Sequence, residues 1–156
     1  MSNTYITAMI DSLNKKIDVL NEIHVKNEEQ LKLAKAVPFS LEDFDKNAEE
    51  KTVLIYKLNK LDEGFDLVYG KIKDELKSNK DAYKDEIRTM QELIGKITDL
   101  SVKIQAEEAR NKSAMESAFK AERTKLNVGR SSVRAIKSYN QTMKAGRSYM
   151  DGRIDG

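Results

Sequence analysis

The side chains best suited to chemistry lie where three otherwise apolar helical stripes become polar. The chain has a single histidine, His24, which shares its stripe with Asn27, and a later stripe contains Glu108 and Asn111. An imidazole beside a carboxylate and an amide could hold a metal ion or carry out acid–base chemistry. One histidine with one or two carboxylates is a small set for either task. We therefore favour a second hypothesis, in which these four residues form a structural polar layer that fixes the alignment of the helices.

The polar positions are predicted to meet because short turns make the helices that carry them antiparallel. Apolar residues recur at alternating four- and three-residue intervals over about residues 3–36, 41–77 and 81–126. This spacing is typical of one face of an α-helix. Counting residues from the two turns places the polar positions of all three helices at one height: His24, Asn27, Lys51, Thr52, Glu107, Glu108 and Asn111.

The two connections have clear start and stop signals. Pro38 ends the first helix, because its ring disfavours the helical conformation in the residue before it. Ser40 is the predicted N-cap of the second helix, and Phe39 is expected to pack against Phe44 as a hydrophobic staple. Residues 77–81, with the sequence KSNKD, form the predicted polar turn before the third helix.

Together these patterns predict an all-α protein: an elongated antiparallel three-helix bundle or coiled coil. The longest stripe runs from Tyr83 to Leu126, so we expect the third helix to be the spine against which the other two pack. Charged residues make up 35% of the chain, which suits narrow seams between long helices better than a thick globular core. The bundle is predicted to span residues 1–126, followed by residues 127–156 as an amphipathic helix or a flexible tail.

Several classes of function receive no support from the composition. The chain has no cysteine, which excludes disulfides, thiol nucleophiles and cysteine metal sites. It has no glycine-rich phosphate loop, nucleophile elbow or pair of histidine ligands, so we expect no enzymatic activity, no cofactor, no metal and no small-molecule substrate. Charges interrupt the first twenty residues, and no later run of 18 apolar residues occurs. We expect neither a signal peptide nor an integral membrane segment, and hence a cytoplasmic location.

The C-terminal part of the chain differs in charge from the rest. Residues 120–156 contain nine Lys or Arg and three acids, a net charge of +6. Apolar side chains nevertheless recur there at helical spacing, and they define the candidate partner-binding residues: Val133, Ile136, Tyr139, Asn140, Met143 and Tyr149. One hypothesis is a recognition segment, residues 127–156, that orders when it binds a partner. The other is a fourth short helix that closes the bundle and ends in a frayed tail.

Several stretches of the sequence also carry a family resemblance. The chain has LDEGFDLVY at residues 61–69 followed by EL at 75–76, ITDL at 97–100, and IQAEEARN at 104–111. Together with the tyrosine-bearing segment 131–149, these stretches resemble the FlgN-type flagellar export chaperones of Gram-positive bacteria. The resemblance extends over most of the chain from about residue 10.

The resemblance implies a cytosolic chaperone with protein partners. Such chaperones hold flagellar hook-associated proteins, which form the hook–filament junction, before type III export, and they deliver these clients to the export gate. In the family the helical bundle is the scaffold, and the C-terminal helix engages the client and the export machinery. Here that role would fall on Val133, Ile136, Tyr139 and Met143, with Asn140 and Tyr149 beside them.

Two other classes of function remain open. Tyr139 and Tyr149 lie among cations and could stack on the bases of a nucleic acid. A charge of +6 spread over 37 residues is weak support for phosphate binding, so nucleic acid is not the expected partner. The remaining alternative is a structural coiled-coil homo-oligomer or adaptor, in which the C-terminal segment closes a homodimer.

Overall fold

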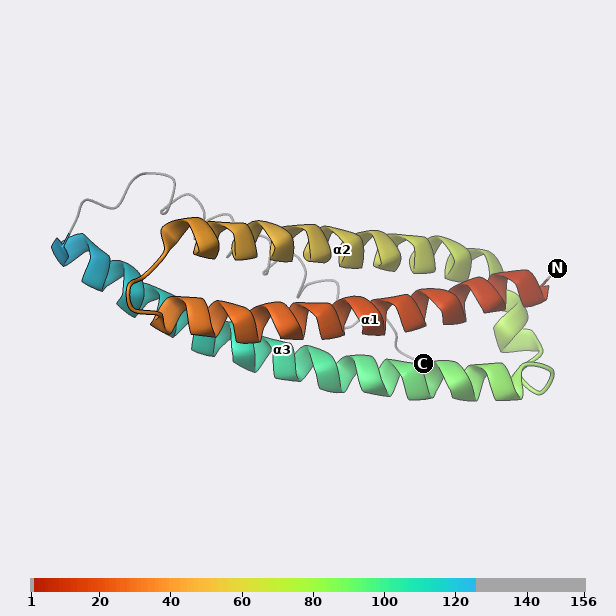
Figure 1. Ribbon diagram of the computed structural model, residues 1–156. Coiled ribbons are helices and arrows are strands. Elements are labelled where there is room, and N and C mark those ends of the chain that lie inside the picture. Colours follow the sequence, from red (N-terminus) through yellow and green to blue (C-terminus); the bar gives the residue numbers. More distant parts are fainter. Residues whose placement is uncertain (1, 126–156) are drawn as a thin grey trace.

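The computed structural model describes residues 2–125, and these form an elongated bundle of three helices. The helices are α1 (Ser2–Lys35), α2 (Leu41–Ser78) and α3 (Lys84–Lys125). They lie side by side along one long axis, and each runs antiparallel to the one before it (Figure 1). The predicted all-α three-helix bundle is therefore confirmed for the described part of the chain. The segment 127–156 and Leu126 lie outside the described residues.

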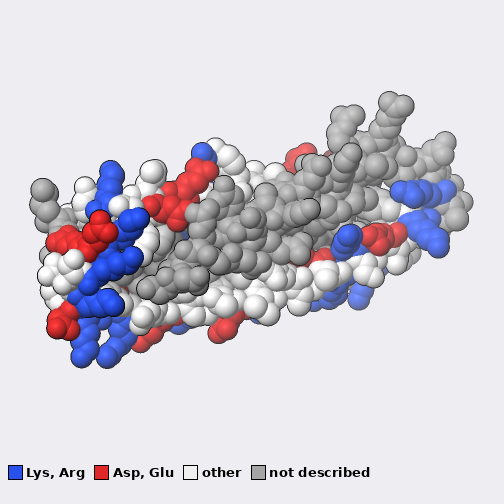
Figure 2. Space-filling model, turned by 180° about the vertical axis from the view of Figure 1, so that it is seen from behind, with Lys and Arg blue, Asp and Glu red and all other residues white. Residues whose placement is uncertain are grey.

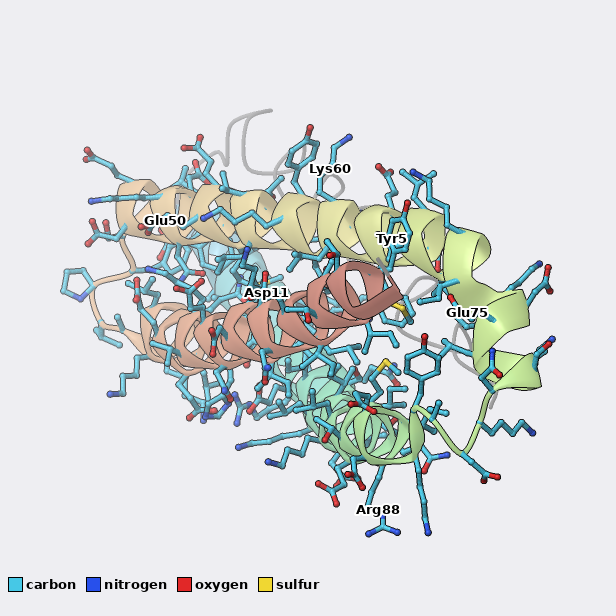
Figure 3. All side chains as sticks on the ribbon, turned by 90° about the vertical axis from the view of Figure 1, so that its right-hand side faces the viewer. Tyr5, Asp11, Glu50, Lys60, Glu75 and Arg88 are labelled. Carbon is cyan, nitrogen blue, oxygen red and sulfur yellow. The ribbon has the colours of Figure 1, made fainter. Side chains whose placement is uncertain are left out.

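The central element of the bundle is α1, and the prediction that the third helix is the spine was wrong. Both α2 and α3 pack along α1, whereas no Cα atom of α2 lies within 8 Å of one of α3 in the described residues. Seen from the end, α2 and α3 lie on two sides of α1 (Figure 3). Adjacent apolar residues, such as Met9 with Ile10, give α1 a stripe wide enough to face two neighbours.

The core follows the helices over their whole length. Its largest fully buried apolar side chains are Met9, Leu20, Ile23, Phe44, Ile55, Leu58, Ile72, Ile104 and Met115. None of the three described helices combines the length and the apolar character needed to cross a membrane.

The start of α3 differs most from the predicted boundaries. The helix begins at Lys84, three residues later than expected. Before it, the amide of Ala82 donates to the carbonyl of Asn79 at 3.0 Å, and the amide of Tyr83 donates to Lys80 at 3.2 Å. These bonds join residues three apart, which is the pattern of turns and not of an α-helix. The polar turn predicted at residues 77–81 therefore extends further along the chain than its composition suggested.

The connection between α1 and α2 has the predicted cap and staple. The hydroxyl of Ser40 accepts a hydrogen bond from the amide of Asp43 at 3.2 Å, and the ring centroids of Phe39 and Phe44 lie 5.9 Å apart. Phe119 of α3 completes this cluster, with centroid distances of 5.5 Å to Phe39 and 5.3 Å to Phe44. Aromatic rings in this edge-to-face arrangement attract one another beyond their area of burial. The cluster bridges α2 and α3 where their backbones do not meet.

We predict that Phe119→Ala lowers the free energy of unfolding by about 3–5 kcal/mol, because it removes a buried ring and leaves a cavity. Urea denaturation followed by circular dichroism measures this change. The matched control is Val102→Ala on the same helix, where the side chain is 62% exposed and a change within about 0.5 kcal/mol is expected. Equal effects of the two substitutions would contradict the bridging role of Phe119.

Candidate functional site

A layer of buried polar side chains crosses the bundle at the height predicted from the two turns. All three helices contribute to it, and its members are buried in spite of their polarity. We name it the Lys51 layer and define it by six residues: Asn27, Gln30, Lys51, Glu107, Glu108 and Asn111. Buried polar groups are costly unless they are paired, so the partners of each one indicate what the layer does.

Lys51 joins all three helices at one point. From α2, its ammonium donates to both carboxylate oxygens of Glu108 on α3, at 2.8 and 3.0 Å. It also donates to the side-chain carbonyl of Gln30 on α1 at 3.2 Å. The side chain of Lys51 is 0% exposed and that of Glu108 is 5% exposed. A single cation therefore fixes the relative position of α1, α2 and α3.

Burial shifts both members of this ion pair toward their neutral forms. It lowers the pKa of Lys51 to about 8, although the Glu108 carboxylate acts in the opposite direction. It also raises the pKa of Glu108, again against the opposing effect of Lys51. Removing two charges from water costs more than their attraction returns in many proteins, although breaking such a pair is strongly destabilising. The pair therefore contributes alignment of the helices more than stability.

The two asparagines of the layer join α1 to α3. The side-chain amide of Asn111 donates to the backbone carbonyl of Asn27 at 2.8 Å and to Gln30 at 3.0 Å. The side-chain amide of Asn27 donates to Glu107 at 3.1 Å. The predicted meeting of Asn27, Glu108 and Asn111 at one height is confirmed. Thr52 is at this height too, but its hydroxyl donates to Ala48 of its own helix.

His24 lies at the edge of the layer and contacts Glu107 instead of Glu108. Its Nδ1 is 2.5 Å from a carboxylate oxygen of Glu107, and the side chain of His24 is 29% exposed. The carboxylate of Glu108 faces Lys51, so the structure does not assemble the metal site hypothesised from His24, Glu108 and Asn111. The hypothesis failed because adjacent residues on α3, Glu107 and Glu108, face different neighbours.

A different trio could supply three ligand atoms for a metal ion. Ligand atoms of His24, Glu28 and Glu107 lie within 4.8 Å of one another, the one such group found in the described residues. The guanidinium of Arg110 donates to Glu28 at 3.0 Å and lowers the pKa of that carboxyl. Glu107 is held by His24 and Asn27. A cation would compete with Arg110 for Glu28, so the geometry supports internal pairing over metal binding.

A second buried ion pair links α1 to α2, and the sequence analysis missed it. Lys16 donates to Asp62 at 2.7 Å, and their side chains are 6% and 7% exposed. A signal for it exists in the sequence. From Phe44, alternating steps of four and three residues along α2 place Lys51 and Asp62 at core positions, as gaps in an otherwise apolar series. A charged residue at such a position indicates a buried pair.

The six residues expected to bind a partner are not placed by the structure. They all lie outside the described residues: Val133, Ile136, Tyr139, Asn140, Met143 and Tyr149. Within residues 2–125, Lys51 and Lys16 are each paired with a carboxylate on a neighbouring helix, and Glu107 accepts from Asn27 and contacts His24. The candidate site is therefore an internal network that aligns three helices.

We predict that Lys51→Met lowers the free energy of unfolding by about 3–5 kcal/mol, because it leaves the Glu108 carboxylate buried without its cation. The double substitution Lys51→Met and Glu108→Met should return stability to within about 1 kcal/mol of the original chain or exceed it. Urea denaturation measures both. Lys60→Met is the control, since Lys60 and Glu63 form an exposed pair whose loss should leave stability almost unchanged. Equal losses in the single and double variants would contradict charge pairing in the layer.

The pKa shifts also predict how stability depends on pH. Since the folded-state pKa of Lys51 is about 8 and the ordinary value is 10.5, the unfolded chain binds more protons between these values. Stability should therefore rise with pH across this window. The raised pKa of Glu108 acts at low pH, where stability should fall as the pH rises above 4.5. Urea denaturation at several pH values, with the double Met variant subtracted, isolates these contributions. If the difference in free energy of unfolding between the original chain and the double variant does not change between pH 8 and 10, the pKa of Lys51 is not strongly lowered.

Comparison of the chain with protein-family models, curated proteins and solved structures finds no match. The resemblance to FlgN-type chaperones therefore rests on the sequence stretches that carry it.

Proposed function

We propose that this protein is a cytosolic export chaperone for flagellar hook-associated proteins. It binds a client through the C-terminal amphipathic segment, prevents premature assembly of the client and delivers it to the type III export apparatus. The three-helix bundle is the scaffold that carries this segment. The proposed contact residues are Val133, Ile136, Tyr139, Asn140, Met143 and Tyr149.

The observation that carries the proposal is the way α3 leaves the bundle. It is the longest of the described helices, with 42 residues, and it continues past the turn between α1 and α2 (Figure 1). Phe119 is the last buried residue among the α3 side chains that the structure describes, which end at Arg123, and Lys120 and Arg123 are exposed. The chain beyond Lys125 therefore starts at a projecting end of the scaffold. This position favours contact with a partner over a place in the core.

The polar interior of the bundle supports a scaffold over an enzyme. Lys51 is paired with Glu108, and Lys16 with Asp62, inside the seams between helices. Catalytic groups need access to a substrate and a suitably placed partner that can exchange protons with it. Buried pairs that hold helices in register do not offer this access.

Holding a client in this way requires no chemistry and no nucleotide. Unpaired apolar stripes of an extended client are an aggregation hazard, and a matching amphipathic helix removes them from water. The cost of ordering the segment offsets much of the free energy gained by burying its apolar side chains, so a weak complex is expected. Weak holding suits a client that must be released for export.

A structural coiled-coil homo-oligomer is the second candidate, and one observation favours it. Val25 and Val53 line the same shallow hollow between α1 and α2, and they are 60% and 54% exposed. Tyr56, 61% exposed, lines the neighbouring hollow on these helices. Exposed apolar side chains that adjoin one another can mark an interface between subunits.

We predict that the double substitution Ile136→Asp and Tyr139→Asp weakens client capture by at least about tenfold, because it would bury two carboxylates in an apolar contact. The melting temperature and helicity of the bundle should stay unchanged. The measurement is capture of cytosolic proteins by the tagged full chain, identified by mass spectrometry, with Val102→Asp as the exposed control on α3.

Three outcomes would contradict the proposal. Unfolding of the double variant would place Ile136 and Tyr139 in the core. If the double variant captures the same partners as the original chain, the segment has no role in binding a client. Sedimentation velocity tests the second candidate. If the original chain forms an oligomer and the double variant does not, the coiled-coil homo-oligomer is supported.

A further inference from the structure

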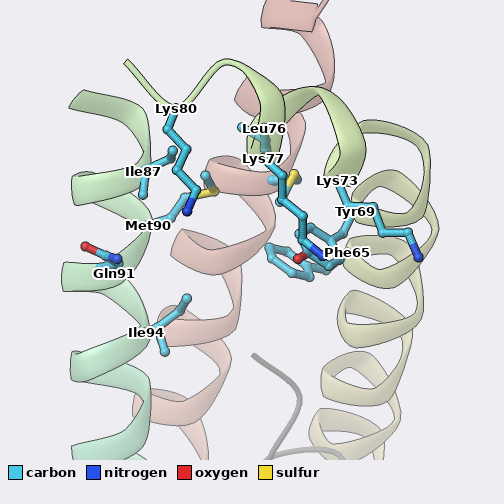
Figure 4. Close-up of a pocket in the computed structure, with 11 residues that line it drawn as sticks. Phe65, Tyr69, Lys73, Leu76, Lys77, Lys80, Ile87, Met90, Gln91 and Ile94 are labelled. Atoms are coloured by element: carbon cyan, nitrogen blue, oxygen red, sulfur yellow. The ribbon is translucent and has the colours of Figure 1, made fainter. Parts of the chain in front are cut away.

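An apolar pocket lies between α2 and α3 at the end of the bundle where these helices are joined. It has a volume of about 320 Å³, which is within the range of ligand-binding pockets. Phe65 and Tyr69 of α2 form one side, Met90 and Ile94 of α3 form the other, and Met9 of α1 also lines it. Figure 4 shows the two sets of side chains directed toward the space between the helices.

The pocket exists because α2 and α3 meet only through long side chains. At the far end, the rings of Phe44 and Phe119 lie 5.3 Å apart and close the gap between these helices. In the middle, the pair Lys51–Glu108 does the same. At the joined end, side chains of α2 and α3 line an open space that Met9 of α1 also reaches. The pocket is thus a consequence of a bundle organised around α1.

The rim of the pocket is basic. Lys73, Lys77 and Lys80 are exposed and line it, and no acidic residue is among the described residues that do so. Lys77, in the last turn of α2, and Lys80, in the connection to α3, extend toward the opening (Figure 4). Figure 2 shows Lys and Arg side chains at this end of the molecule, with Asp and Glu side chains among them. An apolar interior under a basic rim matches a ligand that is apolar on one side and acidic at its edges.

The chain's own C-terminal segment does not match this pocket. The charge of that segment is unsuitable, because residues 120–156 carry a net charge of +6 and would meet a rim of lysines.

We propose that this pocket is a docking site for an amphipathic helix of a partner protein, with two or three apolar side chains flanked by Asp or Glu. The apolar side chains enter between Phe65 and Met90, as in other helix-in-groove complexes. The acidic residues face Lys73, Lys77 and Lys80, which set orientation and speed association. None of the residues named for this docking site belongs to the C-terminal segment of the proposed function. The two proposals can therefore be tested independently.

The test uses the full chain and two labelled peptides. Both peptides are helical, with leucines spaced alternately three and four residues apart. The acidic peptide has glutamates at the positions between the leucines, and the basic peptide has lysines there. Fluorescence anisotropy should show micromolar binding of the acidic peptide. Lys73→Glu, Lys77→Glu and Lys80→Glu together should weaken it about tenfold, since each rim charge contributes modestly. The triple variant should instead prefer the basic peptide, with an unchanged melting temperature.

The matched control carries Lys32→Glu, Lys46→Glu and Lys112→Glu, which change the net charge equally at exposed positions away from the pocket. The proposal is overturned if this control weakens binding as much, if both peptides bind the original chain equally, or if neither binds. Tighter peptide binding by the Ile136→Asp and Tyr139→Asp variant would assign the pocket to the chain's own C-terminal segment. A dimer of the full chain that the rim variant abolishes would assign it to a second copy.

Discussion

The structure depends on one buried cation. Lys51 extends from α2 across the core to Glu108 on α3, and it also binds Gln30 on α1. A helix in an apolar seam can slide along its neighbour by one heptad at small cost, because one aliphatic layer resembles the next. A buried ammonium can be satisfied at one register only, since any slip leaves two charges unpaired in the core. The Lys16–Asp62 pair applies the same constraint to α1 and α2 nearer the other end.

This alignment explains the shape of the bundle. Because α1 packs against both neighbours, it needs the widest apolar stripe, and α2 and α3 are left to meet through long side chains alone. Where those side chains are large, as with Phe44 and Phe119, the seam closes. At the joined end of α2 and α3, a pocket with a basic rim stays open. The same arrangement therefore yields a rigid frame and an available surface.

The proposed docking pocket lies at the end of the frame where α2 and α3 are joined, and the described part of α3 ends at the other. The residues proposed to hold a client follow α3 in the sequence and lie outside the described residues. Under the proposed function, one contact would hold the client and the other would be recognised by a second protein. Two weak contacts on one frame bind an extended partner more tightly than either alone, provided the partner can span both. Release then requires the loss of only one of them.

The sequence by itself determined the features that depend on local physics. Helical periodicity placed the three helices, the cap at Ser40 and the staple of Phe39 on Phe44 followed from residue types, and counting from the turns set the height of the Lys51 layer. The tertiary structure decided which helix is central, that His24 faces Glu107 while Glu108 faces Lys51, and that Lys16 meets Asp62. The physical reason is that the sequence does not fix how each helix is rotated about its own axis. Periodicity defines a stripe on each helix, but the direction in which each side of the stripe points is settled only when all three helices pack together.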